Sequence, residues 1–347
     1  MPERCPARLA RATAAPDQRE IREDDMQHQE TAPEQALAWV EAGKSVALAT
    51  VIETWGSAPR RVGAQMVISD QGEMEGSVSG GCVEGAVVVE ALEVLQEGGT
   101  RVLEYGVSDG DAFAVGLACG GNIRILVEPV GDKGMPVEML HELGAARAAR
   151  EPVAYEVALD GAARRLMREG HEARFRMDRS GLSEDGATFV AIHNPPLRLI
   201  VVGGVHIAQH LVGMARDVGF DPVVVDPREA FGSQSRFPDT RVVNDWPDDA
   251  LAEIGVDART ALVLLTHDPK LDDPALHVAL RSECFYIGAL GSTRTHASRV
   301  ARLKEAGFPD TEIARIHGPV GLNIGAAGPS EIAVSILAQM IQRLRQG

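Results

Sequence analysis

The topology of the second half of this 347-residue chain is set by residues 199–208, Leu-Ile-Val-Val-Gly-Gly-Val-His-Ile-Ala. The apolar run predicts a buried strand, the two glycines predict a tight turn, and the residues that follow predict the start of a helix. Dinucleotide sites use this order, because glycines let the backbone approach a diphosphate and the helix N-terminus offers unpaired N–H groups. We therefore predict a Rossmann-type nucleotide-binding domain.

The candidate nucleotide site consists of residues that follow the predicted strands of this half. Open α/β sheets bind ligands beyond the carboxyl ends of their strands, where these residues are expected to meet. Asp226 ends the strand after the glycine turn, where a carboxylate can accept hydrogen bonds from ribose hydroxyls. Asp268 and Ser292 have a second interpretation, as helix caps without a ligand. The predicted nucleotide-binding residues are Gly203, Gly204, His206, Asp226, Arg228, His267, Asp268, Gly288, Gly291 and Ser292.

Val205 departs from the dinucleotide fingerprint, in which a second glycine stands at its position. A side chain there can keep the backbone from its closest approach to a diphosphate. Two interpretations follow: a domain that binds a nucleotide, or a Rossmann fold that no longer binds NAD tightly.

The rest of the second half alternates short apolar runs with helical stretches. Runs at 197–202, 222–225, 261–265 and 285–287 are apolar throughout, which predicts a mainly parallel sheet covered by helices on both faces. Asn194-Pro195-Pro196 precedes them, and consecutive prolines stop regular structure. We predict a disordered tail at 1–32, an N-terminal domain at 33–193 and the Rossmann-like domain at 197–347.

The sequence pattern of the first half predicts a mixed α/β domain. Apolar spacing indicates helices near 34–42, 83–95 and 135–150. Strands are expected at 44–51, 64–69, 74–79, 100–105, 122–128, 152–158 and 187–192.

Two glycine-flanked cysteines are the chemically notable residues of this half. Cys82, in Ser79-Gly80-Gly81-Cys82-Val83-Glu84, lies directly before a predicted helix, where a thiolate is stabilised and glycine N–H groups can form an anion nest. Cys119-Gly120-Gly121 repeats this pattern, and Arg60 suits an acidic group. The alternative is that small residues fit tight turns and that Arg60 is a solvated surface residue.

Charge and composition exclude several classes of protein. A net charge of −16 with only four lysines argues against nucleic-acid binding. No apolar stretch is long enough for membrane insertion, and the first 33 residues lack a secretory signal. Four cysteines without a paired Cys-x-x-Cys motif favour a reducing, cytoplasmic location and no metal site, and Gly-x-Ser-x-Gly, the hydrolase motif, is absent.

Taken together, these motifs resemble the XdhC/CoxI family of molybdenum hydroxylase maturation factors. The resemblance extends from about residue 34 to about residue 345 and rests on short motifs in a fixed order. These are Gly56–Arg60, Ser79–Glu84, Cys119–Gly121, Gly203–Ala208, Asp226–Arg228, Arg236–Pro238, Thr266–Asp268, Tyr286–Ser292, Pro319–Gly325 and Glu331–Leu337.

The resemblance implies an accessory factor that binds the molybdenum cofactor (molybdopterin) and assists its sulfuration and insertion into a hydroxylase of the xanthine or carbon monoxide dehydrogenase type. It implies an apo-hydroxylase as partner, with a cysteine desulfurase and a second copy of the chain as further candidate partners. Such a chain is more a cofactor-binding chaperone than a catalyst. On this basis Cys82 and Cys119 are candidate sulfur-handling residues. The candidate cofactor-binding residues beside them are Ser57, Arg60, Gly80, Gly81, Glu84 and Gly120.

Two other hypotheses remain open. The glycine turn and Asp226 also fit an NAD-dependent oxidoreductase, with NAD or another nucleotide as cofactor. A scaffold in which both ligand sites are relics is the third. The cofactor hypothesis further expects Cys82, Cys119 and residues 203–208 to face a common cleft between the two halves.

Overall fold

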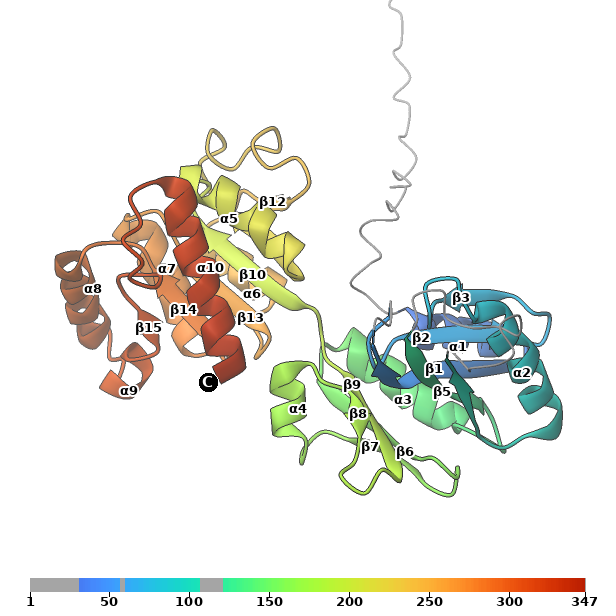
Figure 1. Cartoon of the computed structure of the whole chain (residues 1–347). Coiled ribbons are helices and arrows are strands. Elements are labelled where there is room, and N and C mark those ends of the chain that lie inside the picture. Colours follow the sequence, from blue (N-terminus) through green and yellow to red (C-terminus); the bar gives the residue numbers. More distant parts are fainter. Residues whose placement is uncertain (1–30, 57–59, 107–120, 347) are drawn as a thin grey trace, which may run out of the picture.

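The computed structural model describes residues 31–56, 60–106 and 121–346. Within them, the chain forms a five-stranded and a four-stranded sheet before residue 194 and a six-stranded sheet after residue 196 (Figure 1). The predicted fold class is confirmed, because a mixed α/β half precedes a Rossmann-type half whose described strands are all paired in parallel.

The parallel sheet has the strand order β12-β11-β10-β13-β14-β15. The chain therefore builds outward on one side of β10 and then on the other, which is the order of dinucleotide-binding sheets. Its strands are β10 (Leu197–Val202), β11 (Phe220–Val225), β12 (Arg241–Val243), β13 (Thr260–Leu264), β14 (Tyr286–Ala289) and β15 (Ile316–His317). Its helices are α5 (His206–Asp217), α6 (Pro247–Ile254), α7 (Pro269–Leu280), α8 (Thr293–Glu305), α9 (Asp310–Ile313) and α10 (Pro329–Gln346).

Alternate residues of β10 enter two different cores. Leu199 and Val201 pack in the core beneath α5 and α10, whereas Ile200 and Val202 pack in the core with α6, α7 and α8. All four side chains are fully buried. The continuous apolar run in the sequence follows from this, because a strand covered by helices on both faces has no side that faces solvent.

The first half is built on an antiparallel sheet with the order β3-β2-β1-β5-β4. Helix α2 covers one face, and α1, α3 and the four-stranded sheet β7-β6-β9-β8 pack on the other. The strands are β1 (Val46–Trp55), β2 (Gln65–Ser69), β3 (Met74–Gly76), β4 (Arg101–Tyr105), β5 (Asn122–Pro129), β6 (Val153–Ala158), β7 (Arg164–Met167), β8 (Gly181–Leu182) and β9 (Thr188–His193). The helices are α1 (Ala32–Glu41), α2 (Glu84–Glu97), α3 (Val137–Ala148) and α4 (Glu172–Met177).

The structure differs from the predicted elements in two main ways: some strands have other lengths than expected, and some short elements were not predicted. The strand expected at 44–51 runs from Val46 to Trp55, and β3 ends at Gly76 rather than at residue 79. We did not predict β7, α4 and β8, which contain four, six and two residues. Elements this short hold too few residues to show a periodic pattern.

Ion pairs join the two halves at the amino edge of the parallel sheet. Arg150 pairs with Asp257 at 2.7 Å, and both Arg259 and Arg345 pair with Asp178 at 2.8 Å. Asp257 and Arg259 lie just before β13, and Arg345 lies at the end of α10. The end of the parallel sheet that faces the first half is therefore the end where its strands begin.

The structure also bears on the limits of the domains. Because β9 ends at His193 and β10 begins at Leu197, we propose 33–193 and 197–347 as the two domains. The predicted tail lies almost entirely outside the described residues, and α1 begins at Ala32. None of the helices in the described ranges is both long and apolar enough to cross a membrane.

Candidate functional site

One edge of the antiparallel sheet gathers the candidate residues of the first half. β1 ends there at Trp55, and β5 begins there at Asn122, which pairs with Trp55. β3 ends at the same edge, because β2 is antiparallel to both of its neighbours. The loop that leads to Cys82 therefore leaves the sheet at the same end as the start of β5, with β2 and β1 between the two strands. In the sequence, β5 follows the Cys119 motif.

Glu84 organises the loop from Ser77 to Val83. Its carboxylate accepts hydrogen bonds from the backbone N–H groups of Ser79 at 2.8 Å and Gly81 at 2.9 Å. It also accepts bonds from the hydroxyls of Ser77 and Ser79. Burial opposes ionisation, but these bonds, led by the one from Ser79, outweigh it and lower the pKa of Glu84 from 4.5 to about 2.

The anion nest expected at the glycines is therefore occupied by the chain's own carboxylate. Gly80 and Gly81 have φ of 74° and 102°, a conformation that side chains strongly disfavour. Their N–H groups donate to Ser77 Oγ and to Glu84. In this arrangement the two glycines and Glu84 shape the loop, and Cys82 is the group that the loop exposes to solvent.

Arg60 lies beside this loop. Its Nε donates to the carbonyl oxygen of Ser77 at 3.2 Å, which connects the loop after β1 to the loop before α2. Gly121 is buried directly before β5. The predicted residues Ser57, Cys119 and Gly120 lie outside the described residues.

The second group of candidate residues lies at the carboxyl edge of the parallel sheet. Gly203 has φ of 109°, and a Cβ atom there would lie 2.6 Å from Thr266 Cγ2. A Cβ on Gly204 would lie 2.4 Å from the carbonyl oxygen of Phe231. Both glycines are thus required by the close approach of neighbouring segments, one after β13 and one after β11.

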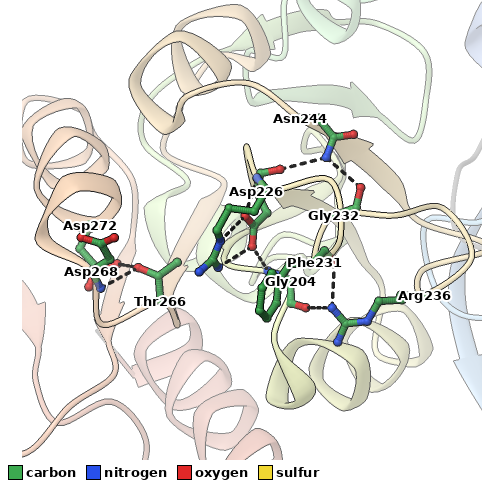
Figure 2. Close-up of polar contacts among 10 residues, drawn as sticks. Gly204, Asp226, Phe231, Gly232, Arg236, Asn244, Thr266, Asp268 and Asp272 are labelled. Carbon is green, nitrogen blue, oxygen red and sulfur yellow. Dashed lines mark hydrogen bonds and ion pairs between the residues drawn. The ribbon is translucent and has the colours of Figure 1, made fainter.

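Asp226 holds the glycine turn in place, as Figure 2 shows. It is fully buried and accepts hydrogen bonds from the N–H of Gly204 at 2.9 Å and from the Arg228 guanidinium at 2.8 and 2.9 Å. Burial raises the pKa of Asp226, but the Arg228 and Gly204 bonds outweigh it and keep the pKa below its ordinary value.

This arrangement differs from the expected role of Asp226 as a ribose acceptor. Both carboxylate oxygens already have partners, and the group next to the solvent is the Arg228 guanidinium, which stacks 4.3 Å from the Phe231 ring centroid. A ligand at this place would meet a cation rather than a free carboxylate.

The N-terminus of α5 leaves two donors open. The backbone N–H groups of His206 and Ile207 donate to no described residue, and Val205, the N-cap, provides no side-chain cap. The Val205 side chain packs against the core beneath α5 and α10. Unpaired N–H groups at a helix start favour an anion, so this turn suits a phosphate group.

Several predicted residues of this edge have structural partners. Asp268 caps α7 by accepting from Lys270 N at 3.0 Å, and Ser292 caps α8 by accepting from Thr295 N at 3.1 Å. Gly288 lies within β14, where a Cβ would lie 2.5 Å from a Val320 methyl group. The helix-cap interpretation of Asp268 and Ser292 thus has direct support.

The side chains of His206 and His267, and Gly291, are the remaining predicted features of this edge. Gly291 has φ of 142°, and a Cβ there would lie 3.0 Å from Thr295. His267 is exposed and has φ of 61°, which is uncommon for a residue other than glycine. His206 is exposed at the start of α5, with its ring 5.4 Å from that of His210.

Sequence reasoning did not assign Arg236 and Asn244 to this site. Arg236 donates to the carbonyl oxygens of Gly204 and Phe231, and Asn244 donates to those of Asp226 and Gly232 (Figure 2). Together they fasten the loop after β11 over the glycine turn. The only signal was the Arg236-Phe-Pro motif, which gives no hint of its partners.

The two groups of candidate residues do not meet within one chain, so the expected common cleft is wrong for the described residues. β10 enters directly from the linker, and its carboxyl end is six residues away from the first half. At roughly 3.3 Å per residue this separates the glycine turn from the junction by about 20 Å. Figure 1 also shows α2, which follows Cys82, at the outer side of the first half.

Comparisons with known proteins agree with this architecture. Residues 39–106 match the family model described as the XdhC and CoxI family, and residues 199–340 match the model of the XdhC Rossmann domain. The chain is 32% identical to the molybdenum cofactor insertion chaperone PaoD of Escherichia coli, over 88% of this chain and 86% of that protein. It is 28% identical to a Bacillus subtilis protein named as a probable xanthine dehydrogenase subunit, over 88% of this chain and 95% of that protein.

A solved structure is also similar over nearly the whole chain. The crystal structure of a protein from Bacillus halodurans, described as a xanthine dehydrogenase, aligns with a TM-score of 0.58 at 30% identity. The alignment covers 91% of this chain and 96% of that one.

Proposed function

This chain belongs to the XdhC and CoxI family, and from that premise we propose that it is a maturation chaperone that binds the molybdenum cofactor and hands it to an apo molybdenum hydroxylase in the cytoplasm. The similarity to PaoD, named a molybdenum cofactor insertion chaperone, extends over most of both chains and supports this role. The second relative, whose name refers to xanthine dehydrogenase, supports a hydroxylase of that type as the partner.

The exposed thiol of Cys82 is the observation on which we base the chemistry. It lies on a loop fixed by Glu84, Ser77 and Ser79, at the sheet edge that also receives Arg60. A fixed, accessible thiol suits a soft metal–sulfur centre, since thiolates are soft ligands. When bound, the molybdenum cofactor would supply the redox-active metal that the partner hydroxylase uses. This chain would bind the cofactor, provide the thiol of Cys82 for its sulfuration and bind the partner hydroxylase.

We propose that sulfuration occurs at this edge, with a cysteine desulfurase as the sulfur donor. Cys82 is the described residue suited to receive sulfur, because the other described cysteine, Cys284, is buried. We also propose cofactor-binding roles for Cys119, Ser57 and Gly120, which belong to the same sequence motifs.

The Cys82→Ser variant is expected to lose maturation activity while remaining folded. In a strain lacking the gene, this variant should give a partner hydroxylase activity that is lower by roughly tenfold or more than the activity given by the wild-type protein. This is the scale on which weakened metal-site contacts act. The measurement is partner activity together with its content of sulfurated cofactor. Cys284→Ala, which removes the buried thiol, is the matched control and should complement fully.

Full complementation by Cys82→Ser would leave the scaffold hypothesis in place and remove Cys82 from the mechanism. A fully active hydroxylase in the deletion strain itself would contradict the chaperone function as a whole. Mass spectrometry of small molecules that co-purify with the protein from a molybdopterin-competent host tests cofactor binding directly.

An NAD-dependent oxidoreductase is the weaker candidate. The strand order and the open N–H groups at α5 favour a nucleotide or another phosphorylated ligand. The carboxylate that would bind a ribose is instead buried beneath Arg228. Titration calorimetry with NADH is expected to show no saturable binding at millimolar concentration, and a micromolar dissociation constant would favour the oxidoreductase.

We also propose that the chain acts as a homodimer. The two candidate sites lie at different ends of one chain, and a two-fold arrangement can bring the Cys82 edge of one protomer towards the carboxyl edge of its partner's parallel sheet. Light scattering after size-exclusion chromatography tests this, and a monomer at all concentrations would contradict it.

A further inference from the structure

A polar pocket lies beside the glycine turn and has no role in the function proposed above. It has a volume of about 250 Å³ and lies between α7 and α8 at the carboxyl edge of the parallel sheet. Pockets for small molecules usually run from roughly 300 to 1,000 Å³, so this one suits a small ligand or one end of a larger one. We call it the arginine pocket, after Arg294, Arg299 and Arg302, which line it. The other lining residues are His267, Pro269, Asp272, Thr295 and Ser298.

Arg299 is the unusual member of this pocket. It is 2% exposed, and only its Nη2 has partners, Asp272 at 3.3 Å and the Leu290 carbonyl oxygen at 3.1 Å. Its Nε and Nη1 have no hydrogen-bond partner among the described residues. Buried guanidinium N–H groups are costly to leave unsatisfied, and a site that retains them is one where a ligand can supply the acceptors.

The charges around the pocket leave an excess of positive charge. Arg302 is neutralised by Asp273 at 2.6 Å, and Arg299 faces the buried Asp272. Arg294 is exposed and makes no ion pair within the described residues. An anion in the pocket would therefore meet Arg294, which has no ion pair among the described residues. To bind the two buried, unpartnered nitrogens of Arg299, it would require that side chain to shift.

The donors lie along one side of a helix. Arg294, Ser298 and Arg302 are spaced four residues apart on α8, so their side chains project from the same face. His267 faces them from the loop after β13. This loop also connects the pocket to the glycine turn. Its residue Thr266 lies so close to Gly203 that a Cβ atom on Gly203 would be 2.6 Å from Thr266 Cγ2.

We propose that the arginine pocket binds a phosphate group, held by Arg294 and by the open nitrogens of Arg299, with the hydroxyls of Ser298 and Thr295 as further donors. Planar guanidinium groups match the oxygens of a phosphate, and such charge-assisted hydrogen bonds are stronger than neutral ones. The site is separate from the N–H groups of α5, so a phosphorylated ligand can contact both ends of the carboxyl edge. The inference is independent of molybdenum chemistry.

Titration calorimetry of the purified full-length protein with inorganic phosphate and with AMP tests this proposal. Arg294→Gln, an exposed substitution, is expected to weaken phosphate binding about tenfold, the effect of losing one charge-assisted hydrogen bond. Arg299→Lys keeps the charge opposite Asp272 but removes the guanidinium fork, and it should weaken binding by a similar factor. Circular dichroism reports whether each variant is folded.

Two control variants distinguish phosphate binding in the pocket from phosphate binding elsewhere in the same half. Arg241→Gln removes an exposed arginine paired with Glu253 elsewhere in the same half, and it should leave phosphate binding unchanged. Arg228→Gln alters the neighbourhood of the glycine turn without touching the pocket. Weaker binding of both probes in Arg294→Gln supports a phosphate ester as ligand, and weaker binding of inorganic phosphate alone supports a free anion.

The proposal is overturned if wild-type protein binds neither probe at millimolar concentration. It is also overturned if Arg228→Gln weakens binding while folded Arg294→Gln does not, because the anion would then lie at the glycine turn. Neither result depends on the chaperone function, since no cofactor or partner protein is present in the assay.

Discussion

Replacement of Glu84 by glutamine is expected to destabilise the protein by about 3 kcal/mol at pH 7, because the pKa of Glu84 falls from 4.5 to about 2 on folding. The side chain is 6% exposed, so solvent does little to screen its hydrogen bonds. Glutamine keeps the shape but loses the charge, and its NH₂ group would face the N–H groups of Ser79 or Gly81. Urea denaturation at pH 7 gives the measurement.

The same substitution should have a defined pH dependence. Because the folded-state pKa is depressed, the stability from Glu84 is fully present above the unfolded value of 4.5. It is lost as the pH falls from about 4.5 to about 2. The difference in free energy of unfolding between wild type and Glu84→Gln should therefore narrow through this range. A difference that stays constant from pH 7 to pH 3 would contradict the assignment.

Glu93→Gln is the matched control for this prediction. Glu93 lies on the same helix, is exposed, and shares Arg101 with Glu90 and Glu97. Exposed ion pairs contribute about 0–1 kcal/mol, so its loss should change stability only slightly. Equal destabilisation by the two variants would mean that Glu84 has no special role in the loop. Loss of maturation activity is expected for Glu84→Gln alone, because only this variant releases the Cys82 loop.

Replacement of Asp226 by alanine is expected to cost about 3 kcal/mol, because it leaves a buried backbone N–H on Gly204 without a partner and frees Arg228. Arg228 can turn to solvent, since its side chain is 40% exposed, so the cost stays below that of breaking a fully buried ion pair. Urea denaturation measures the loss.

Asp221→Ala provides the comparison, because Asp221 is exposed at the start of the same strand. It should change the free energy of unfolding by no more than about 0.5 kcal/mol. The Asp226 variant should also lose binding of phosphorylated ligands at the glycine turn, since the turn is no longer fixed. Wild-type stability in Asp226→Ala would show that the carboxylate is free for a ribose after all.

The sequence alone was sufficient for elements with a strong local pattern. The apolar run of β10 and the glycines after it predicted the strand, the turn and the helix of the Rossmann half. Each of these depends on neighbours in the chain: burial on both faces requires continuous apolar residues, and the backbone of Gly203 requires a residue without Cβ. The short motifs, in their order, were enough to identify the family.

The sequence could not predict hydrogen-bond partners that are distant from each other along the chain. Asp226 was expected to face a ribose, but the tertiary structure pairs it with Gly204, 22 residues earlier, and covers it with Arg228. Glu84 was expected to bind a ligand, and it instead fills the glycine nest. In both cases a buried carboxylate takes the nearest donors, and which donors are nearest is set by folding.

The placement of the two sites was likewise decided only by the tertiary structure. The sequence indicates Cys82 and the glycine turn as candidate site residues. It contains no pattern that predicts the direction of β10 relative to the first half. The linker joins the strand at its amino end, and Arg150, Arg259 and Arg345 hold that end against the first half. Parallel strands all point the same way, so the carboxyl edge of the Rossmann sheet, with the glycine turn, lies at the end of the sheet that is remote from the first half.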